Sequence, residues 1–94
     1  MLLARFRIVG HSMEPFLKEN ENVLVSSLPF LFSEPQAGDV VVFERLKKVY
    51  VKRIKNKIDN NYFLIGDNKN DSEDSRKFGL IPKKDIKGKV IIKL

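Results

Sequence analysis

The run Asp39-Val40-Val41-Val42-Phe43 gives the strongest indication of the fold class. Valine is β-branched and favours strands, and a short apolar run without polar interruptions is typical of a buried strand. Apolar or alternating patterns recur along the chain, at residues 5–8, 22–26, 49–54, 62–65 and 86–92. Helical periodicity does not extend over more than about two turns anywhere. We therefore predict an all-β single domain, either a small barrel or a folded antiparallel sheet.

Polar and glycine-containing segments separate these predicted strands. Asp59-Asn60-Asn61 predicts a hairpin turn that leads into the strand at residues 62–65. Gly88 interrupts the last strand and predicts a bulge or bend, because glycine weakens the interior of a strand. Residues 68–76 contain no hydrophobic side chain, so we predict a polar loop there.

Length and composition exclude several classes of protein. The 94 residues allow one domain, residues 1–94, with a small core. The absence of cysteine excludes disulfides, thiolate metal sites and cysteine nucleophiles. His11 is the single histidine and cannot build a multi-histidine metal centre. The net charge of +6 predicts attraction to anionic lipid or nucleic acid, without choosing between them.

We find no segment that predicts a membrane span or a secretory signal. A spanning helix needs about 20 mostly apolar residues, and the apolar runs here are far shorter. Residues 1–7 become charged too early for a signal peptide. We expect the chain to be cytoplasmic or peripherally membrane-associated.

A first candidate for chemistry is Gly10-His11-Ser12-Met13-Glu14-Pro15, directly after the first predicted strand. Glycine lets the backbone turn sharply, which would present the Ser12 hydroxyl outward beside backbone N–H groups. An acyl-transfer nucleophile needs this environment. The same residues also fit an ordinary turn, and taken alone they favour that simpler interpretation.

A second candidate is Lys52 in Val49-Tyr50-Val51-Lys52-Arg53-Ile54. Strand side chains alternate between faces, so Tyr50, Lys52 and Ile54 share one face. Partial burial there disfavours the ammonium form, and a general base must be neutral to accept a proton. Arg53 cannot take this role because guanidinium stays protonated. The alternative is a lysine that extends along an apolar surface to reach solvent.

The third candidate is the loop from Gly66-Asp67-Asn68 to Asp74-Ser75-Arg76. Its carboxylates suggest calcium, but the spacing lacks the order of the twelve-residue calcium loop, and the neighbouring lysines oppose a cation. A loop fixed by an ion pair of Asp74 with an arginine fits the residues better. Metal binding stays a minor alternative.

Together with Gly38-Asp39 before the buried strand, these three segments resemble, in chain order, the type I signal peptidase family of Ser/Lys-dyad serine endopeptidases. The compact form is also similar to small relatives that mature a nickel superoxide dismutase by trimming its N-terminus. The resemblance covers nearly the whole chain. It implies the family's catalytic β-fold and cleavage of a signal peptide or propeptide after small residues, through an acyl-enzyme and without a cofactor.

Roles for individual residues follow from this resemblance. Ser12 would be the nucleophile, Lys52 its general base, and Ser72 the residue that orients the lysine amine. The backbone N–H of Ser12, at the turn made by Gly10, would donate to the oxyanion. Many members place a second donor, a serine hydroxyl, where this chain has Gly10, so a second donor must come from elsewhere. The expected supporting residues are Asp74, Arg53 and Arg76, which brace the loop, and Met13 and Tyr50, which line the substrate cleft.

Other functions compete with this interpretation. His11 has no second histidine and no evident carboxylate partner in the sequence, which disfavours a Ser-His-Asp triad. The apolar segment at residues 28–32 could dip into lipid or, as readily, fold over the core. A self-cleaving repressor also uses Ser and Lys, but lacks the Gly-Asp-Asn segment. A non-catalytic basic module that binds a membrane or nucleic acid is the alternative from another class, with lysines at 47, 48, 55 and 57.

Overall fold

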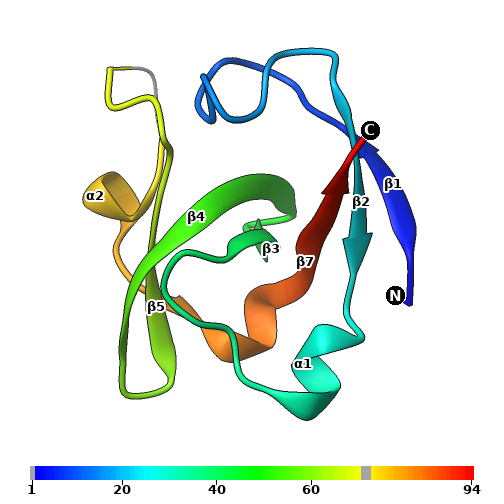
Figure 1. The fold of residues 1–94 in the computed structure, drawn as a ribbon. Coiled ribbons are helices and arrows are strands. Elements are labelled where there is room, and N and C mark those ends of the chain that lie inside the picture. The colour runs from blue at the N-terminus through cyan, green and yellow to red at the C-terminus, as the bar shows by residue number, and fades with distance from the viewer. Residues whose placement is uncertain (1, 71–72) are drawn as a thin grey trace.

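The computed structural model describes residues 2–70 and 73–94 and consists mainly of one antiparallel sheet (Figure 1). Its strands run in the order β1-β2-β7-β3-β4-β5-β6, and the sheet stays open. The all-β prediction is confirmed, in the form of a folded sheet. The strands are β1 (Ala4–Arg7), β2 (Asn22–Ser26), β3 (Val40–Arg45), β4 (Lys48–Ile58), β5 (Asn61–Ile65), β6 (Ile81–Pro82) and β7 (Ile86–Lys93).

Within residues 2–70 and 73–94, three short helical segments connect the strands. They are α1 (Pro29–Phe32), α2 (Ser75–Phe78) and the 3-10 turn η1 (Lys83–Asp85). None has enough turns to produce a helical pattern in the sequence, so periodicity alone predicts loops at these places. In the part of the chain that the structure describes, no helix is long and apolar enough to cross a membrane.

Strand β3 is buried on both faces, as its unbroken apolar run predicts. Val40 and Val42 point into one core cluster, whereas Val41 and Phe43 belong to a second one. The two clusters lie on opposite faces of the strand because side chains alternate along it. The first cluster adds Ile8, Met13, Leu17, Val23 and Val25, and the second adds Ile54, Tyr62, Leu64 and Ile81.

Gly88 lies where β7 changes register against β3, so the predicted bulge is present. Val42 pairs with Gly88, and the next residue of β3, Phe43, pairs with Ile86. A side chain at Gly88 would lie 2.7 Å from Val25 Cγ1 and 3.2 Å from the Ser26 carbonyl oxygen. The close approach of β2 and β7 therefore requires glycine at this position.

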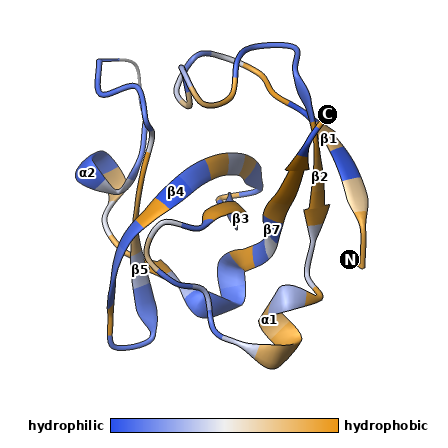
Figure 2. Ribbon diagram, in the orientation of Figure 1, coloured by the Kyte–Doolittle hydropathy of each residue, from blue (hydrophilic) through white to orange (hydrophobic). Residues whose placement is uncertain are grey.

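The apolar segment at residues 28–32 contains α1, which is coloured mainly as hydrophobic in Figure 2. It divides its side chains between core and solvent. Phe30 packs against the second core cluster. Leu31 and Phe32, by contrast, are 70% and 89% exposed. The expectation that the segment folds over the core holds for Phe30, whereas its contact with lipid stays a prediction.

Candidate active site

Ser12 lies in the loop that connects β1 to β2, and the core holds this loop at two points. Met13 and Leu17 are buried in the first core cluster, and the Leu17 N–H donates to the Met13 carbonyl over 2.9 Å. Gly10 enters the loop with φ +84, a conformation that side chains other than glycine rarely adopt. The sharp turn expected before Ser12 is therefore present.

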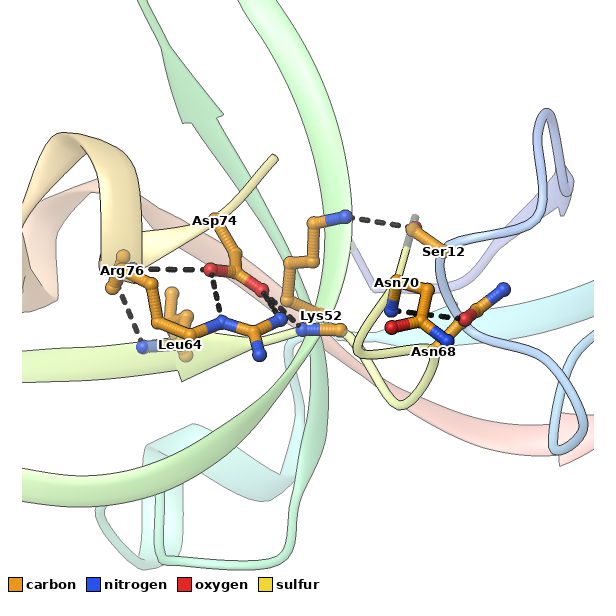
Figure 3. Close-up of polar contacts among 9 residues, drawn as sticks. Ser12, Lys52, Leu64, Asn68, Asn70, Asp74 and Arg76 are labelled. Atoms are coloured by element: carbon orange, nitrogen blue, oxygen red, sulfur yellow. Dashed lines mark hydrogen bonds and ion pairs between the residues drawn. The ribbon is translucent and has the colours of Figure 1, made fainter. Parts of the chain in front are cut away.

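Lys52 lies on β4 opposite Val41 of the central strand, with its side chain only 4% exposed. Its Nζ is 2.7 Å from Ser12 Oγ, although 40 positions separate the two residues (Figure 3). This distance is within the range required of a nucleophile and its base. Ile54 on the same face is also buried and Tyr50 is partly buried, so the face is apolar, as alternation along the strand predicts.

Asn68 connects the loop after β5 to the Ser12 loop. Its backbone N–H donates to the Ser12 carbonyl over 2.9 Å, and its side-chain Nδ2 donates to the His11 carbonyl over 3.1 Å. In the sequence, Asn68 belongs to a characteristic segment, but no pattern assigns it a role. Only the fold brings it within reach of residues more than fifty positions earlier.

Asp74 is fully buried and accepts four hydrogen bonds. Burial by itself would raise the pKa of its carboxyl. Donation from the Arg76 side chain and from the backbone N–H groups of Gly66 and Arg76 outweighs this and lowers the pKa from 3.8 to about 2. The donor–acceptor distances are 2.7 and 3.0 Å from the Arg76 guanidinium, 3.0 Å from its N–H and 2.8 Å from the Gly66 N–H. Asp74 therefore anchors the start of α2 to the end of β5.

Arg53, one of the residues expected to brace the loop, does not pair with Asp74. It makes two hydrogen bonds of 2.8 Å to Asp67 instead, and a third, of 2.9 Å, to the Gly38 carbonyl. Its side chain leaves β4 on the face opposite Lys52, because neighbouring residues of a strand alternate. Ser72, the expected orienting residue, lies outside the described residues.

His11 has carboxylate partners that the residue pattern did not reveal. Its Nδ1 is 2.6 Å from Glu14 Oε2, and its Nε2 is 3.6 Å from Glu19 Oε1. In the sequence, the three-residue separation between His11 and Glu14 is the feature that could have indicated this contact. The His11 side chain is 52% exposed, which places the pair at the surface beside the Ser12 loop.

A cleft of about 550 Å³ opens beside Ser12 and Lys52. Its walls are residues 6–13, which include the end of β1, and residues 48–52 of β4, with Glu73 contributing from a third segment. Met13 and Tyr50 both line it, Met13 as a buried floor residue and Tyr50 partly exposed. Within the described residues, no group of three or more His, Cys, Asp or Glu side chains is arranged to hold a metal ion.

Comparison with known sequences identifies the family. The profile described as "Signal peptidase, peptidase S26" matches residues 1–57 and 55–94. The chain belongs to the signal peptidase family. The family resemblance in the sequence is thereby confirmed.

Individual members of the signal peptidase family differ in what their names state. "Inactive signal peptidase IA" of Staphylococcus aureus (strain MRSA252) is 26% identical over 99% of this chain and 82% of its own length. "Signal peptidase I" of Leptolyngbya laminosa is 22% identical over 92% of this chain and 66% of its length. "Probable signal peptidase I-2" of Synechocystis sp. is 22% identical over 92% of this chain and 60% of its own length. Membership in the signal peptidase family therefore leaves activity to be argued from the site.

Proposed function

We propose that this chain is a serine endopeptidase that cleaves a signal peptide or N-terminal propeptide after small residues, with Ser12 as nucleophile and Lys52 as general base. The observation that carries the proposal is the 2.7 Å contact between Ser12 Oγ and the buried Nζ of Lys52. The proposal treats residues 1–94 as a single catalytic domain. The preference for small residues rests on family membership.

Burial of Lys52 supports its proposed role as a base. Removing an amine from water disfavours its charged form, so the buried side chain is more readily neutral than an exposed lysine. The neutral amine can accept the Ser12 proton as the hydroxyl oxygen attacks the peptide carbonyl. It then donates this proton to the leaving amine, and a water molecule activated in the same way releases the acyl group from Ser12.

The surrounding loops support this geometry. In the proposal, the backbone N–H of Ser12, two residues after the turn at Gly10, is the oxyanion donor. In the proposal, Ser72 orients the Lys52 amine, and the Asp74–Arg76 ion pair fixes the segment that carries Ser72 (Figure 3). Arg53 contributes through Asp67, next to the Asn68 contact with the Ser12 loop.

The cleft has the form required by an extended peptide. Among the described residues, strand β1 pairs only with β2, and residues 48–52 of β4 pair only with β3, since pairing with β5 begins at Arg53. The cleft therefore lies between two strand edges with unused backbone hydrogen-bonding groups. A substrate segment can add to one of these edges as a further strand and so reach Ser12.

The test compares peptides with alanine before the scissile bond as substrates for the wild type and for Ser12→Ala and Lys52→Ala. We expect both substitutions to lower kcat/KM at least about a thousandfold, because each removes one half of the dyad. The matched control is Lys55→Ala, which removes an exposed lysine from the same strand. Circular dichroism establishes that each variant is folded. Full activity of folded Lys52→Ala would refute the proposed base.

The name of the Staphylococcus aureus relative favours one competitor, a non-catalytic binding protein of the same fold. The two functions differ in their pH dependence. A lysine base makes kcat/KM rise with pH, because only the neutral amine accepts a proton. A binding protein shows no turnover at any pH, and its Ser12→Ala variant binds peptides as the wild type does.

Contact with a membrane is a secondary proposal, carried by α1. The exposed Leu31 and Phe32 can enter the interfacial region of a bilayer while the +6 charge attracts anionic headgroups. We expect Leu31→Ser/Phe32→Ser to abolish cosedimentation with phosphatidylserine vesicles. Cosedimentation equal to that of the wild type would contradict this role for α1.

A further inference from the structure

Each strand wall of the cleft carries one cation, Arg7 five positions before Ser12 and Lys48 four positions before Lys52. Arg7 ends β1 and Lys48 begins β4, and both side chains are exposed and line the cleft. They face it from its two strand walls, since the walls meet where Ser12 contacts Lys52 and extend away from there. Any segment bound along the cleft passes this pair.

Neither cation is neutralised in the described part of the chain. The ion pairs found there leave Arg7 and Lys48 without a carboxylate, whereas Lys57 and Lys83 share Glu34. The acidic residues that follow Ser12 are engaged elsewhere, because Glu19 accepts from the Gly10 N–H and Glu21 from the Lys18 N–H.

Among the described residues that line the cleft, Glu73 is the only carboxylate, against the cations Arg7 and Lys48. Glu73 directly precedes Asp74, which accepts from the Gly66 N–H after β5, so Glu73 belongs to neither strand wall of the cleft. The two strand walls, residues 6–13 and 48–52, therefore carry the positive charges of Arg7 and Lys48 and no carboxylate of their own.

The ammonium of Lys48 is also held in place. It lies 5.3 Å from the centre of the Tyr50 ring, in the geometry of a cation–π contact. Tyr50 in turn stacks on Phe43 at 5.2 Å and packs against Phe78 at 5.6 Å. A charge held by a fixed aromatic wall loses less side-chain entropy when it pairs with a ligand.

We infer that this cleft selects peptides with an acidic side chain a few residues from the scissile bond, which pairs with Arg7 and Lys48. The inference deepens the proposed peptidase function and rests on it. Strands advance about 3.3 Å per residue, and Lys48 lies four positions from Lys52 along β4. The acidic residue should accordingly lie about three to five residues from the bond that is cut.

The experiment scans one aspartate through a cleavable peptide, from the fifth residue before the scissile bond to the fifth after it, with asparagine at the same positions as the neutral isostere. We expect one position, about three to five residues from the bond, where aspartate raises kcat/KM about fivefold to tenfold over asparagine. The gain should appear mainly in KM and should disappear at high salt.

Charge reversal identifies the residues responsible. Lys48→Glu and Arg7→Glu should each abolish or invert the ratio of aspartate to asparagine peptide at that position. Lys55→Glu makes the same change of net charge on an exposed site of β4 outside the cleft and should leave the ratio unchanged. Equal ratios at all positions in the wild type overturn the inference, as does an equal loss in Lys55→Glu.

A binding measurement separates this inference from the peptidase proposal. Fluorescence anisotropy with labelled peptides and the Ser12→Ala variant reports selection without turnover. Aspartate-dependent binding that requires Lys48, together with no cleavage by the wild type, would leave the inference standing and refute the peptidase. Cleavage by the wild type without any aspartate preference would support the peptidase proposal and refute the inference.

Discussion

At the residue scale, Ser12 and Lys52 show what sequence can and cannot predict. Alternation along residues 49–54 correctly predicts an apolar face around Lys52, and a glycine turn is expected before Ser12. The residues alone did not establish that the two side chains meet, since Ser12 also fitted an ordinary turn. The match of several ordered segments to one family supplied that expectation, and the 2.7 Å distance agrees with it.

What the sequence does not predict at this scale is which partners meet. Arg53 pairs with Asp67, a partner that no pattern specifies, and His11 has Glu14 as a partner although none was expected. Each carboxylate is among those available in the sequence. Which one lies within reach is determined by the path of loops that share no repeating pattern, so residue types alone do not predict it.

Gly10 provides a test of the Ser12 loop. A methyl group there has open space, so Gly10→Ala introduces backbone strain at φ +84 without a clash. We expect the free energy of unfolding to fall by about 1 kcal/mol. Chemical denaturation measures this loss. Gly10→Asn is the control, because asparagine tolerates positive φ better than alanine and should lose less. Equal stability of Gly10→Ala and wild type would contradict a strained turn.

At the element scale, the start of α2 depends on one buried carboxylate. The pKa of Asp74 in the folded chain, about 2, lies below its ordinary value of 3.8. Between these pH values the unfolded chain binds more protons than the folded one. The stabilisation is therefore complete above pH 3.8 and decreases as the pH falls toward 2.

We expect this group to contribute about 2 kcal/mol to the free energy of unfolding near neutral pH. Asp74→Asn should remove the contribution and flatten the loss of stability between about pH 4 and pH 2, near the two pKa values. Urea denaturation at a series of pH values measures both effects. Glu44→Gln is the control, because Glu44 is an exposed carboxylate of β3. An unchanged acid profile in Asp74→Asn would contradict the assignment.

The contact between β2 and β7 depends on Gly88. A Cβ atom at this position would lie 2.7 Å from Val25 Cγ1 and 3.2 Å from the Ser26 carbonyl oxygen, too close for ordinary contact. Gly88→Ala must therefore separate the two strands, and we expect a loss of about 1–3 kcal/mol. Thermal unfolding measures it, with Lys87→Ala, an exposed neighbour on β7, as control. A melting temperature equal to that of the wild type would show that the strands adjust freely.

At the scale of the whole molecule, the strands were predictable because each has a local pattern, and β3 most of all. The order in which the strands pair was not predictable, because β7 inserts between β2 and β3 although it is last in the chain. This insertion joins the two core clusters through β3. In the described part of the chain it also leaves one edge of β1 and the start of β4 uncovered, the two walls of the cleft.

These uncovered edges lead to a prediction about how substrates bind. A peptide that adds as a strand donates alternate backbone N–H groups to one edge, whereas the intervening groups point away from that edge. N-methylation of an amide that faces the edge should therefore weaken binding of the peptide to the Ser12→Ala variant about tenfold. N-methylation of the next amide along the peptide should have a smaller effect. Titration with a series of singly methylated peptides would show this two-residue period. Equal affinity of all the methylated peptides would mean that side chains alone hold the substrate, and the cleft would then be a pocket rather than a gap in the sheet.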